Sequence, residues 1–283
     1  MGCYDQSEST SLNLLGKSIN NMNTAIITGA SAGIGASAAA LFSQRNFKVI
    51  NLSRRPCKVE GVLNLCGDLA SEENLKNINL ANKVTLVAVS KQQSIDKIVQ
   101  AINCGQNIFG ENYLQEALEK IDLLKEYKLE WHFIGPIQTN KLKLIAEAAD
   151  WVHSVDRIKV VTKLNQACKD LNKKMSILIQ VNIDNEVTKS GVKPEDVLTF
   201  AQEVNSHYSN LELRGLMFMP NINAADKDKL KTYAHIQSLC GSLNEILPNC
   251  TEVSLGTSGD YEKAIVAGSS MVRLGETLLG PRI

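Results

Sequence analysis

The chain has 283 residues, 44% of them hydrophobic, and its 30 basic side chains are balanced by 30 acidic ones. This length allows one large barrel or two small domains, and the neutral balance argues against broad nucleic-acid binding, which depends on neutralising phosphates. Seven scattered cysteines without a CxxC spacing predict reduced thiols in a cytoplasmic protein and argue against a zinc site or a disulfide framework.

The N-terminal part predicts a leader followed by a fragment of a doubly wound sheet. Residues 1–22 are polar and lack the apolar core of a signal peptide, so we expect a disordered leader. Within residues 23–80, a strand at 24–29 runs into a glycine turn and an alanine-rich helix, and further strands are expected at 48–55 and 61–69. This order predicts a partial Rossmann βαβ segment.

The turn TGASAGIG, residues 28–35, resembles the cofactor turn of short-chain dehydrogenases. Small residues in such a turn let a pyrophosphate approach the helix N-terminus. Arg54 and Arg55 follow the second strand, where basic residues favour the 2′-phosphate of NADP. The chain has no YxxxK motif, so we interpret the segment as a truncated fragment and keep an NADP-dependent reductase as the alternative function.

Residues 81–283 show eight apolar, β-branched runs that alternate with helical patterns. The expected strands are 84–89, 106–110, 130–135, 150–155, 176–183, 211–219, 252–256 and 270–274. Between the first two, Ile95, Ile98, Val99 and Ile102 have the spacing of an amphipathic helix. Eight strand–helix units in about 200 residues predict an α/β fold, a closed (β/α)8 TIM barrel, with an open parallel sheet as the alternative. No apolar run reaches the ~20 residues that would span a membrane.

Several polar groups follow these strands, at the end where such barrels carry their active groups. Lys91 directly follows the first barrel strand, Ser258 follows the seventh, and Arg273 and Gly275 lie at the end of the eighth. The last two loops of a TIM barrel often bind phosphate. A lysine facing a phosphate site suggests pyridoxal 5′-phosphate (PLP) held as a Schiff base. Taken alone, Lys91 would be interpreted as a surface lysine and His132 as a core histidine.

Residues 84–283 resemble the YggS-like PLP homeostasis proteins. The motifs LVAVSK, FGENYLQE, WHFIGPIQTNK, VHSVDR, KSG and AGSSMVRLG occur in the order of that family. The resemblance implies a barrel like the N-terminal domain of alanine racemase, with Lys91 as the Schiff-base lysine. It also implies that Ser258 and the amides around Gly275 hold the phosphate and that Arg273 faces the pyridine nitrogen. Asn112 and His132 are implied as further pocket-lining groups.

Two positions depart from the family pattern. Gly259 separates Ser258 from Asp260, and Glu276 follows Gly275 where Thr or Ser is common. Because a carboxylate repels a nearby phosphate unless it turns away, we leave Glu276 out of the expected site.

The same resemblance bears on whether the chain catalyses a reaction. An arginine against the pyridine nitrogen makes the cofactor a weaker electron sink, and a racemase needs acid–base groups on both faces of the substrate carbon. Related racemases take one of these from a second domain, which we do not expect after Ile283. We therefore expect a monomeric, cytoplasmic carrier or regulator of PLP, without catalytic residues or a metal, that serves PLP-dependent apo-enzymes. An amino-acid racemase is the alternative.

Overall fold

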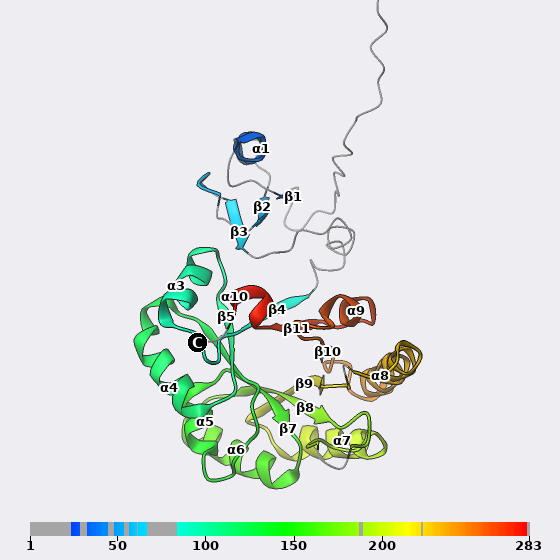
Figure 1. Cartoon of the computed structure of the whole chain (residues 1–283). Coiled ribbons are helices and arrows are strands. Elements are labelled where there is room, and N and C mark those ends of the chain that lie inside the picture. The colour runs from blue at the N-terminus through cyan, green and yellow to red at the C-terminus, as the bar shows by residue number, and fades with distance from the viewer. Residues whose placement is uncertain are drawn as a thin grey trace, which may run out of the picture. The chain divides into compact units, whose positions relative to one another are not determined.

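The computed structural model describes residues 24–28, 33–44, 48–53, 57–60, 62–66, 84–186, 189–221 and 223–281. The chain divides into two compact units, residues 1–70 and 71–283 (Figure 1). The expected leader lies outside the described residues. So does the stretch around residue 80 where we expect the barrel domain to begin, and that boundary stays a prediction.

The first unit contains the expected βαβ order. Its three strands pair in parallel in the order β1-β2-β3, and they span Thr24–Thr28 (β1), Lys48–Ser53 (β2) and Val62–Cys66 (β3). Helix α1 (Gly33–Gln44) connects β1 to β2, and Ala39 packs with Val49 and Cys57 in a small buried cluster. Residues 29–32 of the glycine turn and residues 54–56, which include Arg54 and Arg55, lie outside the described residues. The resemblance to short-chain dehydrogenases therefore stays a prediction.

The second unit is a closed barrel of eight parallel strands. The strands are β4 (Thr85–Val89), β5 (Ile108–Glu111), β6 (Glu130–Phe133), β7 (Trp151–Val155), β8 (Met175–Val181), β9 (Leu211–Phe218), β10 (Glu252–Ser254) and β11 (Met271–Leu274). Consecutive strands are neighbours, and β11 pairs with β4 so that the sheet has no edge. The TIM barrel prediction is confirmed, and the open-sheet alternative is wrong.

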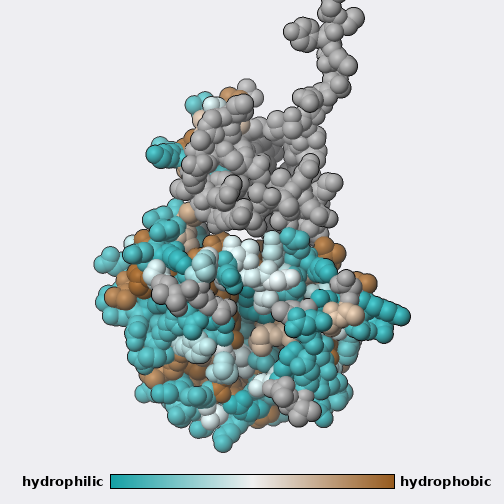
Figure 2. Space-filling view, in the orientation of Figure 1, coloured by the Kyte–Doolittle hydropathy of each residue, from teal (hydrophilic) through white to brown (hydrophobic). Residues whose placement is uncertain are grey.

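A helix follows each of the eight barrel strands. They are α3 (Ile95–Asn103), α4 (Leu114–Leu123), α5 (Leu142–Ala148), α6 (Ile158–Asp170), α7 (Val197–His207), α8 (Asp226–Ile246), α9 (Tyr261–Val266) and α10 (Glu276–Leu279), with short 3₁₀ turns η1 (Lys125–Tyr127) and η2 (Pro194–Asp196). Figure 2 shows that the visible outer surface of this unit is mainly hydrophilic. None of the described helices is long and apolar enough to cross a bilayer.

Helix α3 illustrates why the sequence forms these layers. The Ser94 hydroxyl caps its first turn by accepting from the Lys97 amide, which satisfies one of the unpaired amides of a helix start. Ile98 is fully buried against Phe109 of β5, and burial of such a side chain contributes ~1.5–3 kcal/mol. The apolar face of the helix thus fixes it against the strands that lead into the polar mouth.

Side-chain alternation along the strands separates the outer core from the barrel interior. Trp131 and Phe133 of β6 pack in clusters between sheet and helices, so His132 between them points inward. One part of the interior is filled by Leu178, Met217 and Met271, packed against Trp151. Arg273 lies two residues beyond Met271 on β11, so its side chain shares the interior face and is aimed toward the mouth.

Candidate cofactor-binding site

A pocket of about 300 Å³ opens at the carboxyl end of the barrel and is lined mainly by residues at the ends of its first two and last two strands. Five of the six predicted site residues line it: Lys91, Asn112, Ser258, Arg273 and Gly275. Lining residues outside the predicted set include Val89, Gln93, Ile134, Met219 and Thr257. The pocket therefore combines cationic and hydrogen-bonding groups from both ends of the barrel sequence.

The turn that carries Lys91 follows β4 directly. The Ser90 amide donates to the Gly110 carbonyl and the Gln93 amide donates to the Ser90 carbonyl, which closes the turn around Lys91. Gly275 lies against this strand, because a Cβ atom at that position would lie 3.3 Å from the Val89 carbonyl oxygen. Closure between β11 and β4 is what brings the lysine next to the last two loops.

The loop after β10 is held by Asp260. One carboxylate oxygen of Asp260 accepts from the Thr257 amide at 2.7 Å and from the Thr257 hydroxyl at 3.0 Å. Gly256 begins the loop with φ of +98°, in the left-handed region that favours glycine. These contacts fix the backbone on either side of Ser258, whose hydroxyl oxygen accepts from the Thr277 amide at 3.4 Å.

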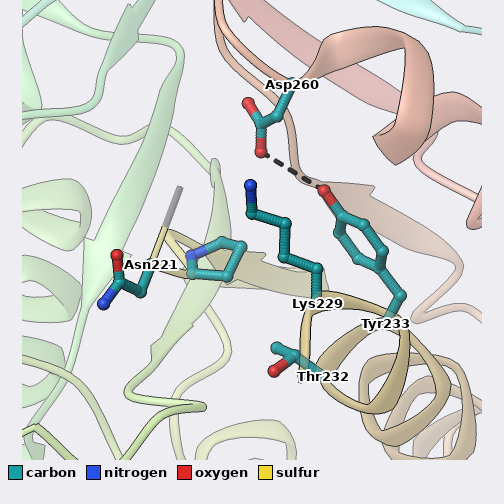
Figure 3. A pocket seen from close by; sticks show the side chains of 6 residues that line it. Asn221, Lys229, Thr232, Tyr233 and Asp260 are labelled. Carbon is teal, nitrogen blue, oxygen red and sulfur yellow. Dashed lines mark hydrogen bonds between the residues drawn. The ribbon is translucent and has the colours of Figure 1, made fainter. Parts of the chain in front are cut away.

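A second layer behind this loop comes from helix α8. Figure 3 shows Tyr233 pointing toward Asp260, with the Lys229 amine lying close to both. The Tyr233 hydroxyl donates to Asp260 at 3.5 Å. Burial, followed by the effect of Asp260, raises the pKa of Tyr233 to about 12, so this phenol is protonated and able to donate at neutral pH.

Arg273 forms part of the pocket floor. Its guanidinium donates through Nη1 to the Ser254 hydroxyl at 2.5 Å and through Nη2 to the Phe218 carbonyl at 2.9 Å. Burial lowers the pKa of Arg273 to about 10, and Asp260 acts in the opposite direction. The side chain is therefore still cationic at neutral pH, and the hydrogen bonds hold it in one orientation.

A chain of hydrogen bonds continues from Arg273 through the barrel interior. We call Ser254, His153, His132 and Glu130 the histidine chain. The successive distances are 3.0 Å from Ser254 Oγ to His153 Nδ1, 2.8 Å from His153 Nε2 to His132 Nδ1, and 2.7 Å from His132 Nε2 to Glu130. Because Arg273 can only donate to Ser254, a consistent assignment has every later group donating onward to the Glu130 carboxylate.

The protonation states agree with this direction. Burial, with smaller effects of His132 and Arg273, holds the pKa of His153 well below its usual value, so the ring is neutral. The hydrogen bond from His132 lowers the pKa of Glu130, so this carboxyl is ionised and accepts. The family resemblance implied that His132 lines the pocket, but His132 is not among the lining residues. The structure connects His132 to the pocket through His153, Ser254 and Arg273.

Two observations concern charge and unpaired atoms in the pocket. Glu276, which we left out of the expected site, is among the residues that line the pocket, as the first residue of α10. Among the described residues, Asn112 Oδ1 is a buried atom without a hydrogen-bond partner. Such an atom in a pocket wall is typical of a group that pairs with a ligand.

A neighbouring pocket of about 390 Å³ shares Met219, Thr257 and Arg273 with the first. Its other side includes Lys189, which forms ion pairs with Glu186 at 2.8 Å and Asp184 at 3.6 Å. The shared wall places the two pockets side by side.

The barrel matches known proteins over most of its length. Residues 69–282 match the family model described as "Alanine racemase, N-terminal domain". A pyridoxal phosphate homeostasis protein from Vibrio alginolyticus is 43% identical over 204 residues, which cover 70% of this chain and 87% of that protein. The chain belongs to the pyridoxal phosphate homeostasis protein family. Its relative of the same name from Escherichia coli K12 is 37% identical over 235 residues, covering 82% of this chain and 95% of the relative.

Solved structures extend this comparison. PipY of Synechococcus elongatus, whose structure has PLP bound, superposes with a TM-score of 0.65 and 28% identity, covering 72% of this chain and 99% of PipY. An alanine racemase of Clostridium difficile gives a TM-score of 0.58 at 14% identity, covering 72% of this chain and 55% of the racemase. The second comparison shows the fold alone. The family therefore shares the barrel of alanine racemase.

Proposed function

We propose that this chain binds PLP at the mouth of its barrel, as a Schiff base on Lys91, and acts in PLP homeostasis. The observation that carries the proposal is the placement of Lys91, Ser258 and Arg273 around one pocket of about 300 Å³, a volume within the range of cofactor sites. The membership of the family and the PLP bound to PipY support it.

The residues of the pocket fit the chemistry of the cofactor. The aldehyde of PLP supplies an electrophile that condenses with a lysine amine with loss of one water. Lys91 provides the amine, and the Ser258 hydroxyl and the backbone around Gly275 provide donors for the anionic phosphate. Asn112 Oδ1, buried and unpartnered among the described residues, would gain a partner from the bound molecule.

We further propose that the chain carries PLP and is not a strong catalyst. Arg273, whose pKa is about 10, is cationic at neutral pH, and hydrogen bonds to the Ser254 hydroxyl and the Phe218 carbonyl hold it in place. If it faces the pyridine nitrogen, it opposes protonation of that nitrogen. The bound cofactor is then less able to stabilise the carbanions that racemisation requires. A chiral assay with alanine and serine tests this part, and turnover comparable to that of racemases would contradict it.

Borohydride reduction followed by peptide mapping tests the central proposal. In the wild-type chain incubated with PLP, we expect one reduced, cofactor-labelled peptide that contains Lys91. Lys91→Ala should lose the label and the visible absorbance. Lys125→Ala, at a largely exposed lysine outside the pocket, is the matched control and should keep both. Unchanged labelling in Lys91→Ala would refute the assignment of the lysine.

The remaining parts of the proposal concern context. We propose that PLP-dependent apo-enzymes receive the cofactor, and that the protein is a cytoplasmic monomer with a barrel domain at 81–283. Transfer from the loaded chain to an apo-enzyme and size-exclusion chromatography test partners and oligomeric state. Titration with NADPH tests the alternative reductase. Saturable binding together with carbonyl reduction would favour that alternative.

A further inference from the structure

The backbone on each side of Lys91 is gripped by side chains that lie outside the pocket. Ser90, which precedes Lys91, is fully buried, and Gln92, which follows it, has a positive φ of +54°. A positive φ is costly for a residue with a side chain, so surrounding contacts must maintain this turn. The residues that supply these contacts come from β5 and α4.

Ser90 is held by Glu111 and Lys120. The Ser90 hydroxyl donates to Glu111 Oε1 at 2.6 Å, and the Lys120 ammonium donates to the Ser90 carbonyl at 2.5 Å and to the same Glu111 oxygen at 2.8 Å. Lys120 is 5% exposed and Glu111 is 1% exposed. The hydroxyl and the carbonyl of Ser90 are therefore both held by charged side chains.

Gln92 is held by a second carboxylate, that of Glu116. The backbone amide of Gln92 donates to Glu116 Oε1 at 2.5 Å, and the same oxygen accepts from the Lys120 ammonium at 2.6 Å. Lys120 thus links two carboxylates, one that grips the residue before Lys91 and one that grips the residue after it. We call Glu111, Glu116 and Lys120 the turn clamp.

General stability is a poor explanation for this arrangement. Burying an ion pair costs desolvation that its attraction rarely exceeds, and apolar replacements of such pairs are often neutral or stabilising. Burial raises the pKa of Glu111 against the lowering effects of Lys120 and Ser90, and Glu111 Oε2 is buried without a hydrogen-bond partner among the described residues. The three side chains share one further property, which is their contact with the turn of Lys91.

We propose that the turn clamp is a set of positioning residues that fixes the backbone around Lys91 and so directs its amine to the cofactor pocket. This inference rests on the proposed function of Lys91. None of the three side chains lines the pocket, so they act through the turn and not by touching the cofactor.

Hydrogen exchange on the protein without PLP tests the clamp directly. In Glu116→Ala the Gln92 amide loses its charged acceptor, and we expect its exchange to accelerate about tenfold or more. Glu116→Gln keeps an acceptor oxygen at the same reach and should restore most of the protection. Because the Glu116 side chain is 24% exposed, both variants should fold. Unchanged exchange at Gln92 in folded Glu116→Ala would overturn the clamp, whether or not the chain binds PLP.

The rate of PLP capture tests its consequence for Lys91. We expect Lys120→Met to slow the formation of the reducible Lys91 adduct about tenfold, because the amine is no longer held in a productive orientation. Lys173→Met is the matched control, since Lys173 is also partly buried and donates to two backbone carbonyls, those of Ala146 and Ala149, away from the turn. Equal capture rates in folded Lys120→Met and the control would overturn the inference. Absence of the adduct in the wild-type chain would instead refute the proposed function.

Discussion

Ser254 joins the cofactor pocket to the histidine chain, and its removal should have a large effect for so small a change. Its hydroxyl is fully buried, accepts from Arg273 Nη1 at 2.5 Å and lies 3.0 Å from His153 Nδ1. Ser254→Ala removes the hydrogen-bond partner of Arg273 Nη1, which belongs to a charged group, and of His153 Nδ1, which belongs to a neutral one. Each such buried group costs about 1–3 kcal/mol, and the charged one is at the upper end. We therefore expect a loss of about 4 kcal/mol in the free energy of unfolding.

Urea unfolding at pH 7, followed by tryptophan fluorescence, measures this loss in the barrel. Both tryptophans of the chain, Trp131 and Trp151, lie on barrel strands, so the signal reports that unit. Ser154→Ala is the matched control, because the buried Ser154 hydroxyl donates to one neutral carbonyl, that of Gly135, and should cost only about 1 kcal/mol.

The outcome also separates stability from function. Ser254→Ala should weaken PLP binding more than Ser154→Ala does, because Arg273 loses one of the two hydrogen bonds that orient it. If the free energy of unfolding of Ser254→Ala lies within about 1 kcal/mol of the wild-type value, Arg273 and His153 have found other partners, and the reasoning from the hydrogen-bond chain is refuted.

Three further predictions follow from other contacts. The pKa of His153 is lowered in the folded state, so below pH ~6.5 the unfolded chain binds a proton at this residue that the folded chain does not. As the pH falls further, the free energy of unfolding of the wild-type chain should decrease by up to ~1.4 kcal/mol per pH unit more than that of His153→Gln. Parallel pH profiles of the two chains in urea unfolding would contradict this. Glu276→Gln removes a negative charge from the pocket and should tighten PLP binding about threefold in a spectroscopic titration, with weaker binding as the contrary result. A Cβ atom in Gly135→Ala would lie 2.0 Å from the Asn112 carbonyl oxygen, so the variant should lose ~1–3 kcal/mol of unfolding free energy, and wild-type stability would show that the backbone relaxes.

The barrel was predictable because its strands are buried on both sides and therefore appear as continuous apolar runs. All eight were found, although β5 begins at Ile108, two residues later than expected, and β10 ends at Ser254, two residues earlier. The short helices α5 and α9 carry too few turns for a recognisable period and were not assigned.

The pocket residues were predictable for a different reason, because each lies at or just after the end of a strand and all parallel strands end on one side. His132 was placed there from the family resemblance, although the outward-facing neighbours Trp131 and Phe133 indicate an inward position deeper in the barrel. Glu276 was left out of the expected site because its carboxylate would repel a phosphate. Its position is set instead by the backbone, since helix α10 begins directly after Gly275. The contact between Lys120 and the Ser90 carbonyl joins a helix to a distant turn, and no local pattern indicates it.

Pairing of β11 with β4 joins the last strand of the barrel to its first, and residues on both sides of this junction line the candidate pocket. During synthesis, Lys91 emerges long before Arg273, so the pocket cannot assemble until the strand that carries Arg273 has also emerged. A ligand that contacts residues on both strands would stabilise the pairing of β11 with β4, and the protection of the barrel against separation of these strands would increase with ligand occupancy. Saturation with the cofactor and resistance of the C-terminal strand to proteolysis should therefore rise together.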